Sequence, residues 1–139
     1  MHILDTDTLT HLYAGHPRVI ERLHAVHDPD VGTTIITKAE MLRGRFEFLL
    51  KAASGEELLR AQHWLDRTEE LLAQIIVIPV DKIVAAQFTR LRALKDLRKI
   101  GRADLLVASI VLAHRAILVT RNIRHFQQIP GLKPVNWVD

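Results

Sequence analysis

The chain contains no cysteine, so it has neither a disulfide scaffold nor thiolate metal ligands. No apolar run approaches the ~20 residues that a membrane-spanning helix needs. The first residues lack the basic segment and apolar stretch of a signal peptide. These absences predict a protein of a reducing, cytoplasmic compartment with no membrane partner.

Several common catalytic motifs are missing as well. The sequence holds no G-x-S-x-G, no P-loop and no G-x-G-x-x-G, so these forms of nucleophilic and nucleotide chemistry have no support. The eight histidines are scattered along the chain. His24 and His27 share a predicted helical face, but we expect them on the exposed surface and assign no zinc site.

The chain does contain the pattern of one α/β domain, residues 1–139. Apolar residues make up 48% and charged residues 25% of its 139 residues, which is typical of a globular protein. Strand-like and helical segments alternate, and this predicts a three-layer α/β/α sandwich with a mainly parallel sheet of four to five strands. The expected strands are 3–4, 31–36, 75–78, 116–119 and 134–137. The expected helices are 7–14, 17–27, 37–50, 56–73, 81–97 and 103–114, with a short turn or helix in 120–126.

Three of these segments carry more specific predictions. The apolar run 75–78, closed by Pro79, is typical of a parallel strand buried on both faces. Thr37 and Glu40 match the capping box that opens a helix. The helix 103–114 is apolar almost all round, so we expect it to be largely buried.

Polar side chains follow the strands at one edge of the predicted sheet, where ligands bind in parallel sheets. Asp5 follows the first strand, and Glu40 lies early in the helix after the second. The single residue Arg115 joins the helix 103–114 to the fourth strand, so the two run antiparallel and Asp104 returns to the same edge. Asn122 follows that strand. Oxygen ligands gathered in this way suit Mg²⁺ or Mn²⁺.

Each of these acids also has a purely structural interpretation. Asp5 can cap the first helix, Glu40 can complete the capping box, and the helix dipole favours acids in any first turn. Asp104 is the hardest to explain in this way, because its helix is otherwise apolar and a charge that enters a core needs a partner.

Basic residues are concentrated in one segment of the chain. Between residues 98 and 125 there are six lysines and arginines against the single acid Asp104. A local basic field can hold a polyanion, although a solvated helix face would have the same composition.

Four sequence segments resemble the motifs of PIN-domain ribonucleases, specifically the VapC toxins of bacterial toxin–antitoxin pairs. They are HILDTDTL, ITKAEMLRGRF, KIGRADLLVASIVLAH and LVTRNIRHFQQIPGLKPVNW, in this order and over nearly the whole chain. The resemblance implies a divalent-metal-dependent endoribonuclease that hydrolyses RNA phosphodiester bonds with Mg²⁺ or Mn²⁺. It also implies a homodimer and a VapB-like antitoxin that covers the active site.

Asn122 departs from this resemblance, because many family members have a fourth acid there. An amide oxygen can accept a hydrogen bond from metal-held water but brings no charge, so a second metal would bind more weakly. Asp7, two residues after Asp5, can restore part of that charge. The number of metals stays open.

The resemblance and the chemistry together assign roles to the residues at this edge. We expect the carboxylates to hold the metal and orient the attacking water, as in other metal-dependent hydrolases. The expected ligands are Asp5, Glu40 and Asp104, the residues that position water or phosphate are Thr120 and Asn122, and the anchors of flanking phosphates are Arg102, Arg121 and Arg124.

Two other functions remain open at this point. Asn122 allows an inactive PIN-like module that binds RNA or a protein. The Asp5-Thr6-Asp7 segment approaches the nucleophile motif of haloacid-dehalogenase-type phosphatases, but their later paired acids have no counterpart after the fourth strand.

Four apolar residues are candidates for partner contacts. A small domain need not bury them completely, so they are expected at a dimer face or antitoxin groove, or else in the ordinary core: Trp64, Leu71, Trp137 and Val138.

Overall fold

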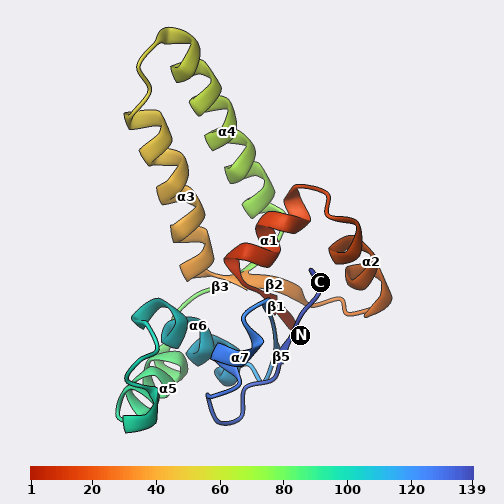
Figure 1. Ribbon diagram of the computed structural model, residues 1–139, viewed down its shortest axis with the longest axis vertical. Helices are drawn as coiled ribbons and strands as arrows, with labels where there is room; N and C mark the ends of the chain where they lie inside the picture. The colour runs from red at the N-terminus through yellow and green to blue at the C-terminus, as the bar shows by residue number, and fades with distance from the viewer.

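Five parallel strands form one sheet in the order β3-β2-β1-β4-β5. The computed structural model describes residues 1–139. The strands are β1 (His2–Leu4), β2 (Val31–Thr34), β3 (Ile76–Ile78), β4 (Ile117–Val119) and β5 (Pro134–Val135). The predicted three-layer α/β/α sandwich with a parallel sheet is confirmed (Figure 1).

The central strands supply both hydrophobic cores. Ile3 pairs with Leu118 and Leu4 pairs with Val119, and all four side chains are fully buried. Ile3 and Leu118 belong to the larger core, whereas Leu4 and Val119 belong to the smaller one. Because successive strand residues point to opposite faces, even these short strands pack on both sides.

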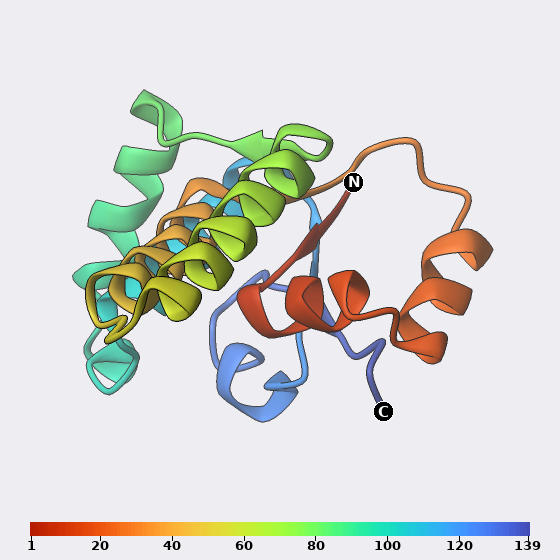
Figure 2. The same ribbon diagram turned by 90° about the horizontal axis from the view of Figure 1, so that it is seen from above.

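Helices cover the two faces in separate groups. On the side of Leu4 lie α1 (Thr6–Tyr13), α2 (Pro17–Ala25) and the end of α4 (Gly55–Ala73). On the side of Ile3 lie α5 (Lys82–Arg92), the 3₁₀ turn η1 (Lys95–Leu97), α6 (Arg102–Ala113) and α7 (Ile123–Phe126). Seen from above, α2 and α5 lie at opposite margins (Figure 2). No helix combines the length and apolar character needed to cross a bilayer.

A helical hairpin extends beyond the sheet. It consists of α3 (Ile35–Leu50) and α4, which lie side by side over their length (Figures 1 and 2). Ser54 caps α4 by accepting a hydrogen bond from the backbone N–H of Glu57, at 3.2 Å. Because the hairpin projects beyond the sheet, α3 and α4 pack mainly against each other. Several large apolar side chains on them are exposed, among them Phe46, Phe48, Leu50, Leu59 and Trp64.

The start of α3 corrects the predicted capping box. Thr34, not Thr37, is the capping residue, and its hydroxyl accepts a hydrogen bond from the Thr37 backbone N–H at 3.2 Å. The helix therefore begins at Ile35, two residues before the predicted start. As a result the carboxylate of Glu40 is not used by a cap and remains exposed.

The prediction that residues 75–78 form a strand buried on both faces is wrong. β3 is an edge strand, and Ile76 is 43% exposed. Its neighbour on β2 is Gly32, where an added Cβ would lie 2.6 Å from the carbonyl oxygen of Ile76. Only glycine therefore fits at this point of the β2–β3 pairing.

Two further predictions are corrected near the ends of elements. The helix expected to run to Leu97 ends at Arg92, and the backbone turns at Leu94, which brings Leu97 into the core. Trp137 and Val138 are buried in the smaller core, which was the alternative to a partner surface expected for them. The final strand is shorter than expected, and the chain after Val135 folds back over β1 instead.

The strand order places a topological switch point between β1 and β4. The chain passes from β1 to β2 and β3 in one direction, then crosses to β4 and β5 in the other. In open parallel sheets the crevice beyond the carboxyl ends of the strands at such a point is the usual ligand site. Asp5 follows β1 and Thr120 follows β4, so both border this crevice.

Candidate active site at the switch point

Asp5 is held in place by its own backbone and by the helix that follows it. Its N–H donates to the carbonyl oxygen of Val119 at 3.0 Å. Its Oδ1 accepts from the backbone N–H of Thr8 at 2.9 Å, so Asp5 is the N-cap of α1. Helix capping therefore uses one of the two carboxylate oxygens of Asp5. Oδ2 makes no hydrogen bond within the protein and is available to a ligand.

Glu40 is tied to the residue next to Asp5. The Thr6 hydroxyl donates to Glu40 Oε1 at 3.0 Å and lies 3.0 Å from the Thr37 hydroxyl. This contact holds the second turn of α3 against the first residue of α1, and it leaves Oε2 free of hydrogen bonds. No role was expected for Thr6, although its position between Asp5 and Asp7 placed it at this edge.

Asp104 has a partner that was not expected from the sequence. His125 Nε2 lies 3.0 Å from Asp104 Oδ2. The Asp104 side chain is 44% exposed, so it lies at the rim of the core rather than inside it. His125 belongs to α7, which follows β4 and therefore returns to the same edge. The position of His125 shortly after the fourth strand already indicated in the sequence that it lies at this edge. It was not singled out there because the eight histidines are scattered along the chain.

Thr120 and Asn122 occupy different environments. Thr120 is fully buried, and its hydroxyl accepts a hydrogen bond from the Asn122 backbone N–H at 3.1 Å. The backbone N–H of Thr120 donates to the carbonyl oxygen of Val135 at 2.8 Å. Asn122 is exposed at the start of α7. Thr120 therefore shapes the turn that presents the Asn122 amide.

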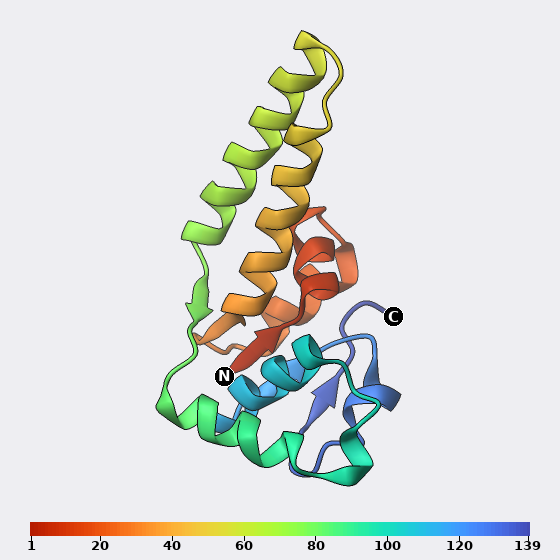
Figure 3. The ribbon, with the colours of Figure 1, turned by 90° about the vertical axis from the view of Figure 1, so that its left-hand side faces the viewer.

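Three hydrogen-bond contacts and the stretches of chain between them connect the elements that carry the three acids. Glu40 contacts Thr6, Asp5 contacts Val119, and the chain after Val119 leads to His125 on Asp104. Helix α6 also contacts α3. In Figure 3, α6 runs in the direction opposite to the β1 arrow. A metal site shared by the three acids stays a prediction.

No lysine or arginine neutralises these carboxylates. Asp5 and Glu40 form no ion pair, and His125 is the one basic partner of Asp104. No three histidine, aspartate or glutamate side chains are close enough together to hold a metal ion as they stand. The chemistry of the set still fits Mg²⁺ or Mn²⁺, because those ions use one or two carboxylates and complete their coordination with water and phosphate.

Asp7 and Arg121 pair with other charged groups. Arg121 lies 3.3 Å from Asp139 and 3.9 Å from Asp7. Hydrogen bonds from Asn136, which has the larger effect, and from Arg121 lower the pKa of the Asp139 carboxyl. Asp7 also lies 3.6 Å from His11. In contrast, the exposed side chains of Arg102 and Arg124 form no ion pair or hydrogen bond.

A groove of about 610 Å³ begins at Glu40 and runs along the helical hairpin. Its walls come from α1, α3 and α4, and its apolar lining includes Tyr13, Met41, Phe48, Trp64 and Leu71. Arg45 lies 5.4 Å from the centre of the Trp64 ring and donates to the Thr68 hydroxyl at 3.0 Å. The Tyr13 hydroxyl donates to Leu71, and burial raises the pKa of Tyr13. Two of the four apolar residues expected at a partner surface, Trp64 and Leu71, therefore line this groove.

Comparisons with known proteins agree on one family. The PIN domain family matches residues 2–132. The chain is 29% identical over 140 residues to "Ribonuclease VapC1" of Haemophilus influenzae strain R2866, an alignment that covers 99% of this chain and 98% of that protein. It is 53% identical to "Ribonuclease VapC2" of Rickettsia felis over 38 residues, or 27% of this chain and 28% of that protein.

Solved structures show the same fold. VapBC2 from Rickettsia felis, bound to a DNA fragment from its promoter, matches with a TM-score of 0.75 and 27% identity over 98% of both chains. VapBC-1 from nontypeable Haemophilus influenzae matches with a TM-score of 0.78 and 24% identity over 99% of this chain and 98% of that chain.

Proposed function

The chain belongs to the PIN domain family, and from this membership we propose that it is an endoribonuclease that acts as the toxin of a toxin–antitoxin pair. One observation carries the proposal. Three carboxylates from separate elements border the switch point of the sheet, each has a free oxygen, and none is neutralised by lysine or arginine. The similarity to VapC ribonucleases over the full chain supports the same reaction.

The residues proposed to hold a divalent ion are Asp5, Glu40 and Asp104. Mg²⁺ or Mn²⁺ at this site would activate the attacking water and neutralise charge that grows on the scissile phosphate. The free oxygens of Asp5 and Glu40 would bind this ion directly or through water. Thr6 and His125 position two of the acids by hydrogen bonds, which is how outer partners tune metal ligands.

The remaining polar residues act on the substrate. The exposed Asn122 amide orients the water or the phosphate, and the buried Thr120 fixes the turn that carries it. Arg102 and Arg124 are free to bind flanking phosphates. Arg121 can do so only if it leaves Asp139, so it contributes less than these two. Asp7, which is already paired with Arg121, adds a distant negative charge.

The test is cleavage of a single-stranded RNA by the purified chain in EDTA, Mg²⁺ and Mn²⁺. We expect cleavage in either metal and none in EDTA. Asp104→Asn and Glu40→Gln should abolish it, while Glu47→Gln, which changes an exposed acid farther along α3, should not. A chain that binds RNA but cleaves it in neither metal would be the inactive PIN-like module instead.

A VapB-like antitoxin is the partner that we propose for the groove. Six of the thirteen residues that line the groove are hydrophobic, Arg45 and Arg67 stand on its walls, and Glu40 lies at one end. An amphipathic segment of the antitoxin would bury Phe48 and Trp64 and lie over the catalytic edge. The test is titration of the toxin with its antitoxin. Trp64→Ala should weaken binding at least tenfold, and Leu59→Ala, on the same helix but outside the groove, should have little effect.

The homodimer expected for VapC toxins also remains a proposal for this chain. Light scattering at several concentrations of the purified chain measures it directly. A mass near twice 15.8 kDa would support the dimer, and a constant monomer mass would oppose it.

A further inference from the structure

Three arginines surround a hollow beside the first turn of α6. The hollow has a volume of about 270 Å³, and its rim consists of Arg92 from the end of α5, Arg98 after η1 and Arg102 at the start of α6. Its floor consists of Leu97, Ile100 and Leu105, which are buried. This arginine pocket lies outside the carboxylate site, although Arg102 precedes Asp104 by only two residues.

The guanidinium groups of the arginine pocket have no anionic partner in the protein. Arg92, Arg98 and Arg102 are exposed and form no ion pair or hydrogen bond. The guanidinium carbons of Arg92 and Arg102 lie 5.8 and 6.0 Å from the centre of the Phe88 ring. An arginine over an aromatic ring keeps the N–H donors in the plane of its guanidinium free, and they can hold a phosphate through two hydrogen bonds. Contact with Phe88 therefore orders both guanidinium groups without using their hydrogen-bond donors.

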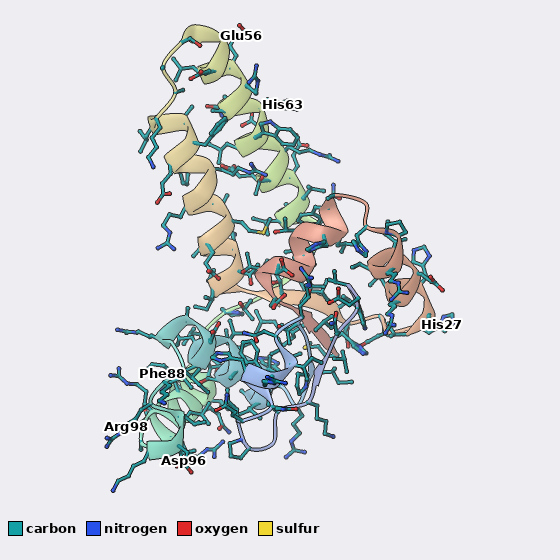
Figure 4. The ribbon with its side chains drawn as sticks, viewed as in Figure 1. His27, Glu56, His63, Phe88, Asp96 and Arg98 are labelled. Carbon is teal, nitrogen blue, oxygen red and sulfur yellow. The ribbon has the colours of Figure 1, made fainter.

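Helix α6 adds a second source of positive potential. Its cap residue is Gly101, and no side chain caps its N-terminus. The free backbone N–H groups at the start of a long helix favour anions. Figure 4 shows Phe88 and Arg98 at the end of the molecule away from Glu56, which marks the tip of the helical hairpin. The arginine pocket and the apolar groove therefore extend from the catalytic edge in different directions.

We propose that the arginine pocket binds the backbone phosphates of single-stranded RNA a few nucleotides from the scissile bond. The inference rests on the proposed ribonuclease function and adds the path of the substrate. RNA leaves the carboxylates over the first turn of α6, contacts Arg102, and then reaches Arg98 and Arg92. The antitoxin can occupy the groove along the helical hairpin while the arginine pocket lies on the other side of the catalytic edge.

The test measures binding of fluorescent RNA in EDTA, so that no cleavage occurs. The variant is Arg92→Gln with Arg98→Gln, because both side chains are exposed and can change without loss of the core. The matched control is Lys133→Gln, which removes an exposed positive charge before β5, at the opposite edge of the sheet. Dodecamer and trinucleotide RNAs are compared at several salt concentrations, and thermal melting checks that every variant is folded.

We expect the double variant to raise the Kd of the dodecamer at least fivefold and to change that of the trinucleotide less than twofold. The slope of log K against log salt concentration should become shallower by about 1.4 in the double variant. Two phosphate contacts are lost, and each contact to a single strand contributes about 0.7. Lys133→Gln should change neither quantity.

Other outcomes would overturn the proposal. Unchanged affinity and salt dependence in the double variant would show that RNA does not use the arginine pocket. If the double variant bound RNA normally but lost binding to poly-glutamate, the pocket would be a contact for an acidic protein. If wild-type protein neither bound nor cleaved RNA, the proposed function would fail together with this inference.

Discussion

The Nε2 atom of His125 lies 3.0 Å from Oδ2 of Asp104, and this contact joins α7 to the first turn of α6 across the catalytic edge. It leaves Oδ1 of Asp104 free of hydrogen bonds. The imidazole therefore sets the direction in which the second oxygen points.

His125→Ala should raise the Mn²⁺ concentration for half-maximal RNA cleavage by about tenfold, because loss of a partner behind a metal ligand commonly costs 10–100-fold in affinity or activity. His125→Gln keeps an N–H near the same position and should recover most of the loss. The measurement is cleavage rate against Mn²⁺ concentration at constant pH. Equal metal dependence in wild type and the alanine variant would remove His125 from the site.

Mn²⁺ should raise the melting temperature of the wild-type protein. Clustered carboxylates repel one another until a cation binds, and a ligand that binds only the folded state stabilises it by mass action. Thermal melts in EDTA and in millimolar Mn²⁺ measure this rise, which Asp104→Asn should largely abolish. Asp66→Asn, on the outer face of α4, is the control. If Mn²⁺ shifted no midpoint, the three acids would not form a metal site and the RNA-binding module would be favoured.

Thr6→Val should reduce RNA cleavage about tenfold. The variant keeps the shape of threonine but removes the hydroxyl that holds Glu40 Oε1, and a hydrogen bond to a charged group contributes about 1.5–3 kcal/mol. Thr6→Ser retains the hydroxyl and should cleave RNA nearly as fast as wild type. Cleavage rates at saturating Mn²⁺ test this, and equal rates for the valine and serine variants would show that Glu40 needs no tether.

The stability of the fold should depend on pH through Asp28. Its carboxylate lies 2.6 Å from His2 Nδ1 and 3.2 Å from the amino group of Met1, and its Oδ1 accepts from the backbone N–H of Asp30. These hydrogen bonds, the one from His2 above all, lower the pKa of Asp28 to about 2. The ordinary value is about 3.9.

Since the folded-state pKa is the lower one, the stabilisation is complete above pH ~4 and is lost as the pH falls toward about 2. Asp28→Asn should therefore melt at a lower temperature than wild type at pH 6, and the gap should close between pH 4 and pH 2. Asp30→Asn alters an exposed neighbouring carboxyl without an ion pair and provides the control. A gap that stayed constant down to pH 2 would refute the role of the charge.

Gly32→Ala should destabilise the protein by about 1–3 kcal/mol, the usual cost of overpacking a well-packed position. Its Cβ would meet the carbonyl oxygen and the Cβ of Ile76 at 2.6 and 2.9 Å, and backbone must move to relieve the contact. Gly44→Ala is the matched control, because that glycine lies inside α3 with nothing within 4 Å of the added Cβ. The control should stabilise the protein slightly, since alanine favours helix more than glycine does. Urea unfolding of both variants measures the contrast.

The sequence predicted which elements carry the three acids and in which direction these elements run, because connections in α/β folds are short and follow few topologies. The joint between α6 and β4 has three residues, 114–116, rather than the single residue expected, and it still turns the chain back. The spacing of strands and helices likewise predicted the parallel sheet and its layers.

The partners of the acids could not be predicted in the same way. Thr34 and Thr37 both stand in position to cap α3, and only packing decides that Thr34 does so. That choice in turn exposes Glu40 to Thr6. His125 was missed because its contact depends on the direction of a side chain on a four-residue helix, which no sequence periodicity encodes. Trp137 was misplaced since the chain leaves the sheet after Val135 and folds over the smaller core.

The position of β1 in the middle of the sheet also governs when the site can form. Asp5 is synthesised more than 100 residues before β4, but β1 pairs with β4, and the Asp5 N–H donates to the carbonyl oxygen of Val119. A nascent chain that has not yet released residues 117–125 from the ribosome lacks both that strand and His125. The proposed nuclease would therefore stay inactive until β4 and α7 have emerged, and a neutralising partner could be supplied during that interval.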